Sequence, residues 1–254
     1  CVFVDGILVG NSRNTFAPSV GSQNQPFFIG RYGNFSTSND LSGWIDRFRV
    51  TNGSDRYLTG FTAPTAAFPD SAPSDPYFAN VSLLLHMNGV DGSTTFTDSS
   101  SNNLTTTPRG GLALSNFRSK FGTTSGRFIR SSSQSLDVAL GTNLFNYYLS
   151  DFTIEAWINL ATYPAGSGYS SAYWILGAGT LNSSTGLDFY VNPTQLMFSV
   201  ANDATATVVG YHGFLLDTWY HVAVTRNGNA FYMFVNGECI GVGYSTSSAA
   251  VPVN

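Results

Sequence analysis

The chain has 254 residues, of which 43% are hydrophobic and 10% are charged, and its formal net charge is −4. This length and apolar content allow a sizeable core, in one large β domain or in two smaller ones. The small negative charge gives no basic surface for nucleic acid or for an anionic membrane, and no apolar run approaches the roughly 18–20 residues of a transmembrane helix.

The first segment of the chain resembles a segment close to its end. Residues 2–10, VFVDGILVG, align with residues 233–241, MFVNGECIG, and the turn is Asp-Gly in one copy and Asn-Gly in the other. We therefore expect one repeat and a little more, in a window cut from a longer extracellular or particle-borne polypeptide. The alternative is chance resemblance, because both dipeptides are common in type I′ hairpin turns.

Residues 43–53, GWIDRFRVTNG, are predicted to form a strand that contains one acidic residue. Simple alternation gives Asp46 the same parity as Trp44, Phe48 and Val50, which directs its carboxylate toward an apolar side. A buried carboxylate must be paired, hydrogen-bonded or bound to a metal. The sequence therefore predicts that Asp46 has a defined partner.

Residues 62–76 are rich in proline and in small polar residues, which indicates an extended linker or a strap along the domain surface. We place a domain boundary here. Residues 1–70 are expected to be the C-terminal part of one sandwich, residues 71–76 a linker, and residues 77–254 the N-terminal two-thirds of a second sandwich.

Residues 152–160, FTIEAWINL, alternate between apolar and mostly polar side chains, which is typical of a half-buried strand. The same period of two occurs in LDFYV from Leu187, QLMFSV from Gln195, WYHVAVT from Trp219 and FYMFV from Phe231. Turn residues separate these short strands, and no helix-length periodicity occurs. The pattern predicts an all-β antiparallel sandwich with marginal helix.

Several segments occur in a characteristic order: 83–104 (LLLHMNGVDGSTTFTDSSSNNL), 119–128 (SKFGTTSGRF), 151–160 (DFTIEAWINL), 219–228 (WYHVAVTRNG), 234–241 (FVNGECIG) and, in the earlier copy, 43–53. This order resembles that of the laminin-G-like, concanavalin A-like lectin/glucanase superfamily. The resemblance implies jelly-roll sandwiches of two curved antiparallel sheets, here as tandem modules truncated at both ends. Such modules usually bind carbohydrate or protein.

A narrower resemblance suggests a setting for the chain. Residues 49–70, followed by LLLHMNGVDGSTTFTDSS from Leu83, are similar to laminin-G-like modules in virion and tail proteins of bacteriophages. We therefore expect a structural and interaction module of a virion or surface protein, with other protein subunits and glycans as partners and with no nucleic acid or membrane. The alternative is a carbohydrate-binding lectin module of a secreted or cell-surface bacterial protein.

The residues argue against catalysis. Retaining glucanases of this superfamily carry two glutamates in an E-x-D-x-E pattern, because two carboxyl groups must flank the glycosidic bond. Glu155 is alone on its predicted strand, and the other glutamate, Glu238, follows a turn. The three histidines show no metal-ligand spacing. We therefore expect a protein that is not an enzyme.

Three residues are candidates for contact with a ligand. Glu155 and Trp157 share the face of their strand opposite the apolar one, and His221 alternates out of phase with Val222 and its apolar neighbours. In a jelly roll this face can be the concave surface, where an aromatic ring stacks on a sugar. The alternative is structural, with the tryptophan and the glutamate buried beneath a loop.

The resemblance also implies calcium as a candidate cofactor; otherwise we expect none. Its ligand would be Asp46 at the sandwich edge, with Asp98 in the TDSSSNN loop as a ligand of the same kind in the next copy. Calcium needs six to eight oxygen ligands. The alternative for Asp46 is to cap backbone amides, or to pair with Arg47 or Arg49.

Overall fold

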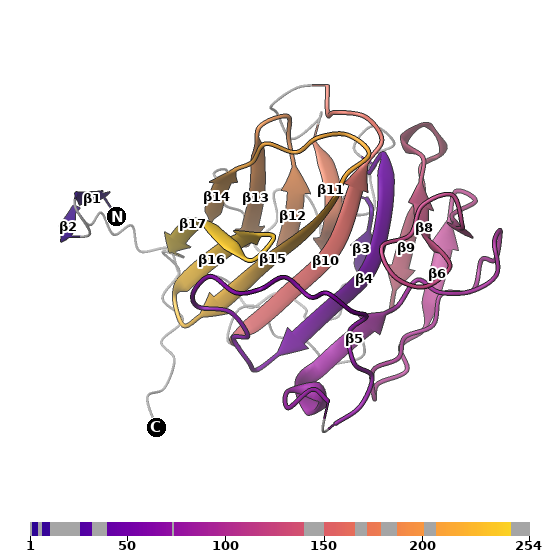
Figure 1. Ribbon diagram of the computed structural model, residues 1–254, viewed down its shortest axis with the longest axis horizontal. Coiled ribbons are helices and arrows are strands. Elements are labelled where there is room, and N and C mark those ends of the chain that lie inside the picture. Colours follow the sequence, from indigo (N-terminus) through magenta and orange to yellow (C-terminus); the bar gives the residue numbers. More distant parts are fainter. Residues whose placement is uncertain are drawn as a thin grey trace.

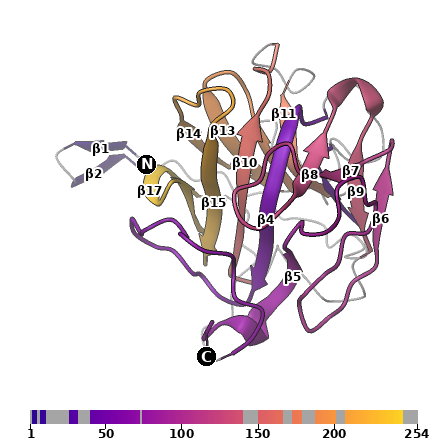
Figure 2. The same ribbon diagram turned by 45° about the vertical axis from the view of Figure 1, so that its right-hand side comes forward.

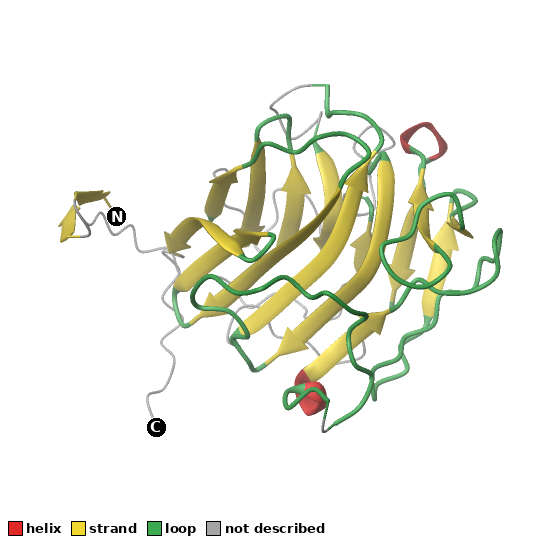
Figure 3. Ribbon diagram, in the orientation of Figure 1, coloured by secondary structure: helices red, strands yellow, loops and turns green. Residues whose placement is uncertain are grey.

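The computed structural model describes residues 2–4, 7–10, 26–31, 40–72, 74–139, 150–165, 172–178, 187–200 and 207–244. In this part of the chain the only helices are two single 3-10 turns, η1 (Phe78–Asn80) and η2 (Arg130–Ser132), and Figure 3 shows how small a share they form. The strands are β1 (Val2–Val4), β2 (Ile7–Gly10), β3 (Phe27–Ile29), β4 (Gly43–Asn52), β5 (Val81–Leu85), β6 (Thr106–Arg109), β7 (Ala113–Ser115), β8 (Ser125–Phe128), β9 (Ser135–Val138), β10 (Phe152–Leu160), β11 (Tyr173–Ala178), β12 (Leu187–Val191), β13 (Gln195–Val200), β14 (Val208–Tyr211), β15 (Trp219–Asn227), β16 (Ala230–Val235) and β17 (Glu238–Tyr244). The predicted all-β class is confirmed.

Two large antiparallel sheets face each other across one hydrophobic core, as Figure 1 and the turned view in Figure 2 show. The front sheet has the order β17-β16-β15-β10-β4-β8-β7, and β5 pairs with β4. The back sheet has the order β14-β13-β12-β11-β3-β9-β6. This two-layer architecture is consistent with the predicted jelly-roll sandwich.

Both faces of β10 are buried. Its apolar residues from Phe152 to Leu160 alternate into the core, as predicted. The opposite face, which we call the outer face of the front sheet, carries Glu155, Trp157 and, on β15, His221. Glu155 and His221 are 0% exposed and Trp157 is 5% exposed. The prediction of a half-buried strand is therefore wrong, because a second layer covers the outer face.

A β-bulge at Arg47 interrupts the alternation of β4. Between two cross-strand pairs β4 has two residues where β10 has one, and Arg47 has a φ of 56°. Asp46 therefore pairs with Trp157 on the outer face, whereas Phe48 and Val50 point into the core. The predicted shared parity of Asp46 with Phe48 and Val50 is wrong, but its predicted burial is confirmed.

β3 and β4 belong to the same sandwich as the rest of the chain. β4 lies between β10 and β8, and β3 lies between β11 and β9. The expected division of residues 1–70 and 77–254 between two sandwiches, with 71–76 as the linker, is therefore not what this structure shows. Without residues 43–52 the strands β10 and β8 would each have an open edge, and open edges recruit strands. A tandem arrangement in a longer polypeptide stays a prediction.

β1 and β2 form a separate two-stranded hairpin (Figure 1). Its register repeats that of β16–β17: Phe3 pairs with Leu8 as Phe234 pairs with Cys239, and in each hairpin a register shift directly precedes that phenylalanine. The place beside β15 is already occupied by β16. The repeat in sequence is thus also a repeat in backbone pairing.

Candidate functional site

The connection between β4 and β5, residues 53–77 without the undescribed residue 73, crosses the outer face of the front sheet. We call it the strap, and Figure 1 shows it in front of β15 and β16. The backbone N–H of Phe61 donates to the carbonyl of Gly237 at 2.8 Å. The Phe61 ring lies edge-on to Phe234 and His221, with centroid distances of 5.2 and 5.7 Å. The proline-rich segment is therefore the second layer that buries the outer face.

Glu155 is the centre of a buried hydrogen-bond network beneath the strap. Arg49 donates to Oε1 from Nε at 2.9 Å and from Nη2 at 2.6 Å. Tyr57 of the strap donates its hydroxyl to Oε2 at 2.9 Å, and His221 Nε2 lies 3.0 Å from the same oxygen. Both carboxylate oxygens are thus satisfied by groups of the chain itself.

Asp75 links the strap to this network. It accepts hydrogen bonds from Arg49 Nη1 at 3.0 Å and from both terminal nitrogens of Arg56 at 3.0 and 2.8 Å. The Arg49 guanidinium also lies 4.0 Å from the centroid of the Phe68 ring, which is buried. A single guanidinium therefore joins the two carboxylates and stacks on a strap aromatic.

The network keeps Glu155 ionised. Burial alone would raise the pKa of its carboxyl group, but Arg49 and the hydrogen bond from His221 outweigh burial and lower the pKa to about 2. An acid with this pKa holds no proton at neutral pH, so Glu155 is unsuited to donate one to a leaving group.

The three predicted ligand residues lie together, as their shared parity implied. His221 bonds to Glu155, and its ring centroid lies 5.4 Å from that of Trp157. Glu155 and His221 are covered by the strap, so they contact protein groups. Of the three, only Trp157 borders an open groove. Contact of these residues with a ligand stays a prediction.

That groove, which we call the tryptophan groove, lies between the strap and the loop formed by residues 116–122. It has a volume of about 650 Å³, and its lining comprises Phe61, Thr62, Ala63, Pro64, Thr65, Lys120, Phe121, Trp157, Trp219 and Asn236. Lys120 Nζ lies 4.1 Å from the centroid of the Trp157 ring. The Trp157 indole N–H is buried without a hydrogen-bond partner in the described residues. Aromatic rings beside polar groups suit a ligand with both apolar and hydroxylated faces.

Asp46 anchors the loop of residues 116–122. Its Oδ2 accepts the backbone N–H groups of Lys120 at 2.8 Å and Phe121 at 2.9 Å, and Arg47 Nη1 lies 3.2 Å from Oδ1. Burial raises the pKa of Asp46 to about 6 and outweighs the opposing effect of Arg47 and of the amides. Asp46 therefore caps backbone amides and pairs with Arg47, which is the predicted alternative to calcium binding. Hydrogen-bond donors and a cation surround its carboxylate, so this site does not fit calcium.

Asp98 is held in the same manner by its own loop. Oδ1 accepts the backbone N–H groups of Leu84 and Ser100, both at 2.9 Å. Oδ2 accepts the Ser100 hydroxyl and the Leu104 N–H, both at 2.8 Å. Four donors occupy the lone pairs that calcium would need. The described residues also contain no group of three His, Cys, Asp or Glu side chains that could hold a metal.

Sequence reasoning missed the partners that matter most. Tyr57 lies 98 residues from Glu155 in the chain and Asp75 lies 26 residues from Arg49, and no local pattern connects either strap residue to the network. Arg49 carried a local signal, since an arginine on a strand with apolar neighbours needs a buried anion. The bulge also had a signal: Ile45 and Phe48, three residues apart, cannot both face the core of a regular strand.

Comparison with known families places this geometry in context. Residues 131–253 match the family model Laminin_G_3, described as the concanavalin A-like lectin/glucanases superfamily. No curated protein and no solved structure matches the chain at a significant level. Among the described residues no helix is long and apolar enough to cross a membrane. The match includes β10 and β15, which carry the centre of the outer face.

Proposed function

We propose, from the premise that residues 131–253 belong to the concanavalin A-like lectin/glucanase superfamily, that the chain is a non-catalytic structural and interaction module of a larger, repeat-containing virion or surface protein. Its partners would be other protein subunits of a particle or filament. The virion setting rests on the expected resemblance of residues 49–70 and 83–100 to phage virion modules, which the family match to residues 131–253 does not test.

The observation that carries this proposal is the duplicated hairpin. β1–β2 has the pairing and the register shift of β16–β17, whose inner strand β16 pairs with β15. β1 therefore has the sequence and register to pair with a second strand of the β15 type, such as a preceding module would supply. In a repeat protein, each module can contribute segments that its neighbour completes.

Hydrogen exchange tests this directly. In the 254-residue chain, residues 233–241 should exchange slowly and residues 2–10 quickly, because among the described strands β16 has a further partner in β15, whereas β1 and β2 pair only with each other. In the parent polypeptide both segments should be protected to a similar extent, and residues 233–241 serve as the internal standard. Rapid exchange of residues 2–10 in the parent polypeptide would refute the proposal.

The state of the two buried acids supports the absence of catalysis. The Glu155 carboxylate is buried, and its oxygens are engaged by Arg49, Tyr57 and His221. The other acid of the network, Asp75, is bound by Arg49 and Arg56. A glycosidase needs one acid that carries a proton and a second one that faces the sugar. Release of reducing sugar from β-glucans that disappears in Glu155→Gln would overturn this part of the proposal.

A second candidate function is carbohydrate binding in the tryptophan groove. Trp219, Trp157 and Lys120 border it, and an aromatic ring with neighbouring polar groups can hold a sugar ring. Glycan-array binding that is lost in Trp219→Ala, but kept in a variant of an exposed aromatic elsewhere such as Tyr211→Ala, would favour this candidate. An array with no ligand at millimolar affinity would remove it.

A further inference from the structure

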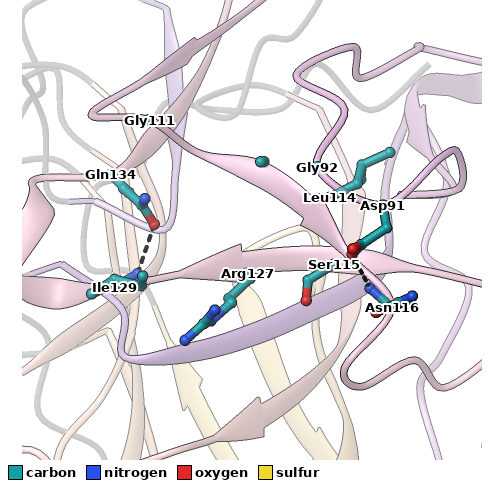
Figure 4. Close-up of a pocket in the computed structure, with 10 residues that line it drawn as sticks. Asp91, Gly92, Gly111, Leu114, Ser115, Asn116, Arg127, Ile129 and Gln134 are labelled. Carbon is teal, nitrogen blue, oxygen red and sulfur yellow. Dashed lines mark hydrogen bonds between the residues drawn. The ribbon is translucent and has the colours of Figure 1, made fainter.

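A second groove lies at the other end of the outer face, beyond the loop of residues 116–122. It has a volume of about 300 Å³, at the lower end of the range of ligand pockets, and strands β7 and β8 form its floor. Figure 4 shows Arg127 of β8 between two hydrogen-bonded pairs, Gln134 with Ile129 and Asp91 with Asn116. We call it the arginine groove.

Arg127 is the only lining residue with a positive charge, and its side chain has no hydrogen bond, ion pair or aromatic contact with any described residue. Its side chain is exposed. Asp91 lines the same groove but lies beyond ion-pair distance, so the guanidinium fork is available to an anionic group. Arginine binds a carboxylate through two parallel hydrogen bonds.

The walls on either side of Arg127 supply one free hydrogen-bond acceptor and one free donor. The Asp91 Oδ1 accepts the Asn116 N–H at 2.8 Å, and its second oxygen has no partner among the described residues. The Gln134 Oε1 accepts the Ile129 N–H at 2.8 Å, so its Nε2 remains a donor. Nε2 is turned toward Gly111, where an added Cβ would lie 4.0 Å from it. Gln134 is only 5% exposed, so its amide is held in place.

We propose that the arginine groove binds an acidic saccharide, with the carboxylate of a uronic acid on Arg127 and ring hydroxyls on Asp91 and Gln134. A hydroxyl both donates and accepts, so it can donate to the Asp91 carboxylate and accept from the Gln134 amide. An acidic peptide or a phosphate would instead meet the negative charge of Asp91. The saccharide is therefore the better match to the mixed charges of this groove.

This inference deepens the carbohydrate-binding candidate but uses different residues. The test is titration calorimetry of the full chain with oligomers of galacturonic, glucuronic and mannuronic acid, and with neutral oligomers of equal length. We expect at least one acidic oligomer to bind at least tenfold more tightly than its neutral counterpart. Arg127→Gln should weaken that binding at least tenfold, and Arg127→Lys should be intermediate because it keeps the charge but loses the fork.

Matched controls separate this site from general attraction and from the tryptophan groove. Arg109→Gln removes an exposed arginine of the back sheet that pairs with Asp137, and it should leave binding unchanged. Trp219→Ala should also leave acidic binding unchanged. The inference fails if no acidic oligomer binds, or if Arg109→Gln weakens binding as much as Arg127→Gln. It also fails if an acidic peptide binds more tightly and depends on Arg127. If neutral glycans bind, this binding is lost in Trp219→Ala and no acidic oligomer binds, the lectin candidate is retained and the acidic-saccharide inference is rejected.

Discussion

The two ends of the outer face use the same chemistry in opposite ways. Beneath the strap, Arg49 is 4% exposed and is bonded to Glu155 and Asp75. At the β7–β8 end, Arg127 is exposed and has no partner among the described residues. One arginine is satisfied by the chain, and the other is left for an external group.

The contrast between Arg49 and Arg127 shows that a place on this sheet face does not by itself decide whether a charged side chain is bonded within the protein. The strap decides it, because it supplies the hydroxyl of Tyr57 and the carboxylate of Asp75 where a ligand would otherwise lie. At the β7–β8 end no described strap residue lines the arginine groove and the loop of residues 116–122 borders it only through Asn116, so the described residues leave this part of the sheet open. Variants at the two ends should therefore differ in what they change.

The largest effect is expected for Glu155→Ala. It leaves Arg49 buried without one of its two carboxylates, and removing one partner of a buried ion pair typically costs about 3–5 kcal/mol of unfolding free energy. Urea denaturation measures this loss. Glu238→Ala, at an exposed position, should stay within about 0.5 kcal/mol of the original chain. Equal stability of the two variants would show that the strap-covered network contributes nothing.

A smaller loss is expected for Gly237→Ala, at the contact between the strap and the β16–β17 turn. Gly237 has a φ of +84°, and an added Cβ would lie 1.7 Å from the Phe61 carbonyl oxygen. The strained backbone alone costs about 1–3 kcal/mol. Limited proteolysis should then cleave the strap faster than in the original chain. Gly92→Ala is the control for backbone strain without a steric clash, because Gly92 has a φ of +79° and no atom lies within 4 Å of its added Cβ.

The third prediction concerns Asp46, whose pKa is raised from 3.8 to about 6 by burial. The folded protein therefore holds this proton more tightly than the unfolded chain. The resulting stability is fully present below pH 3.8 and is lost as the pH rises through about 6. The loss is about 1.4 kcal/mol for each pH unit in this window.

Asp46→Asn removes the titration and keeps one oxygen that accepts the Lys120 and Phe121 amides. The difference in unfolding free energy between Asp46→Asn and the original chain should therefore change between about pH 4 and pH 7. A constant difference would mean that the carboxylate is ionised throughout, stabilised by Arg47 and the two amides.

The smallest effect is expected for Arg127→Gln, at the open end. Because Arg127 has no partner among the described residues, its replacement should alter the unfolding free energy by less than about 0.5 kcal/mol. The same urea experiment measures it. A loss comparable to that of Glu155→Ala would end the contrast between the two ends.

The sequence allowed the strands to be predicted well and their second layer poorly. Alternation located β10, β12 and β13 at the predicted residues, because each has one face in the core. It also placed Glu155, Trp157 and His221 on one face. Alternation carries no information about what covers the other face, since the strap joins the network through contacts distant in sequence. The bulge at Arg47 was not predicted because strict alternation assigns residues 44–50 to two fixed faces, although the three-residue spacing of the core residues Ile45 and Phe48 departs from that period.

The strap also offers a place where the chain can be opened without removing a strand. It joins β4, in the middle of the front sheet, to β5, which pairs with β4, and its residues 65–67 are exposed. A gene in which the chain ends at these residues and continues from β17 into β3 would encode the same sandwich as a circular permutation. We expect residues 27–52 to close the sandwich from either end of such a coding sequence, and cooperative folding of the permuted chain would test this.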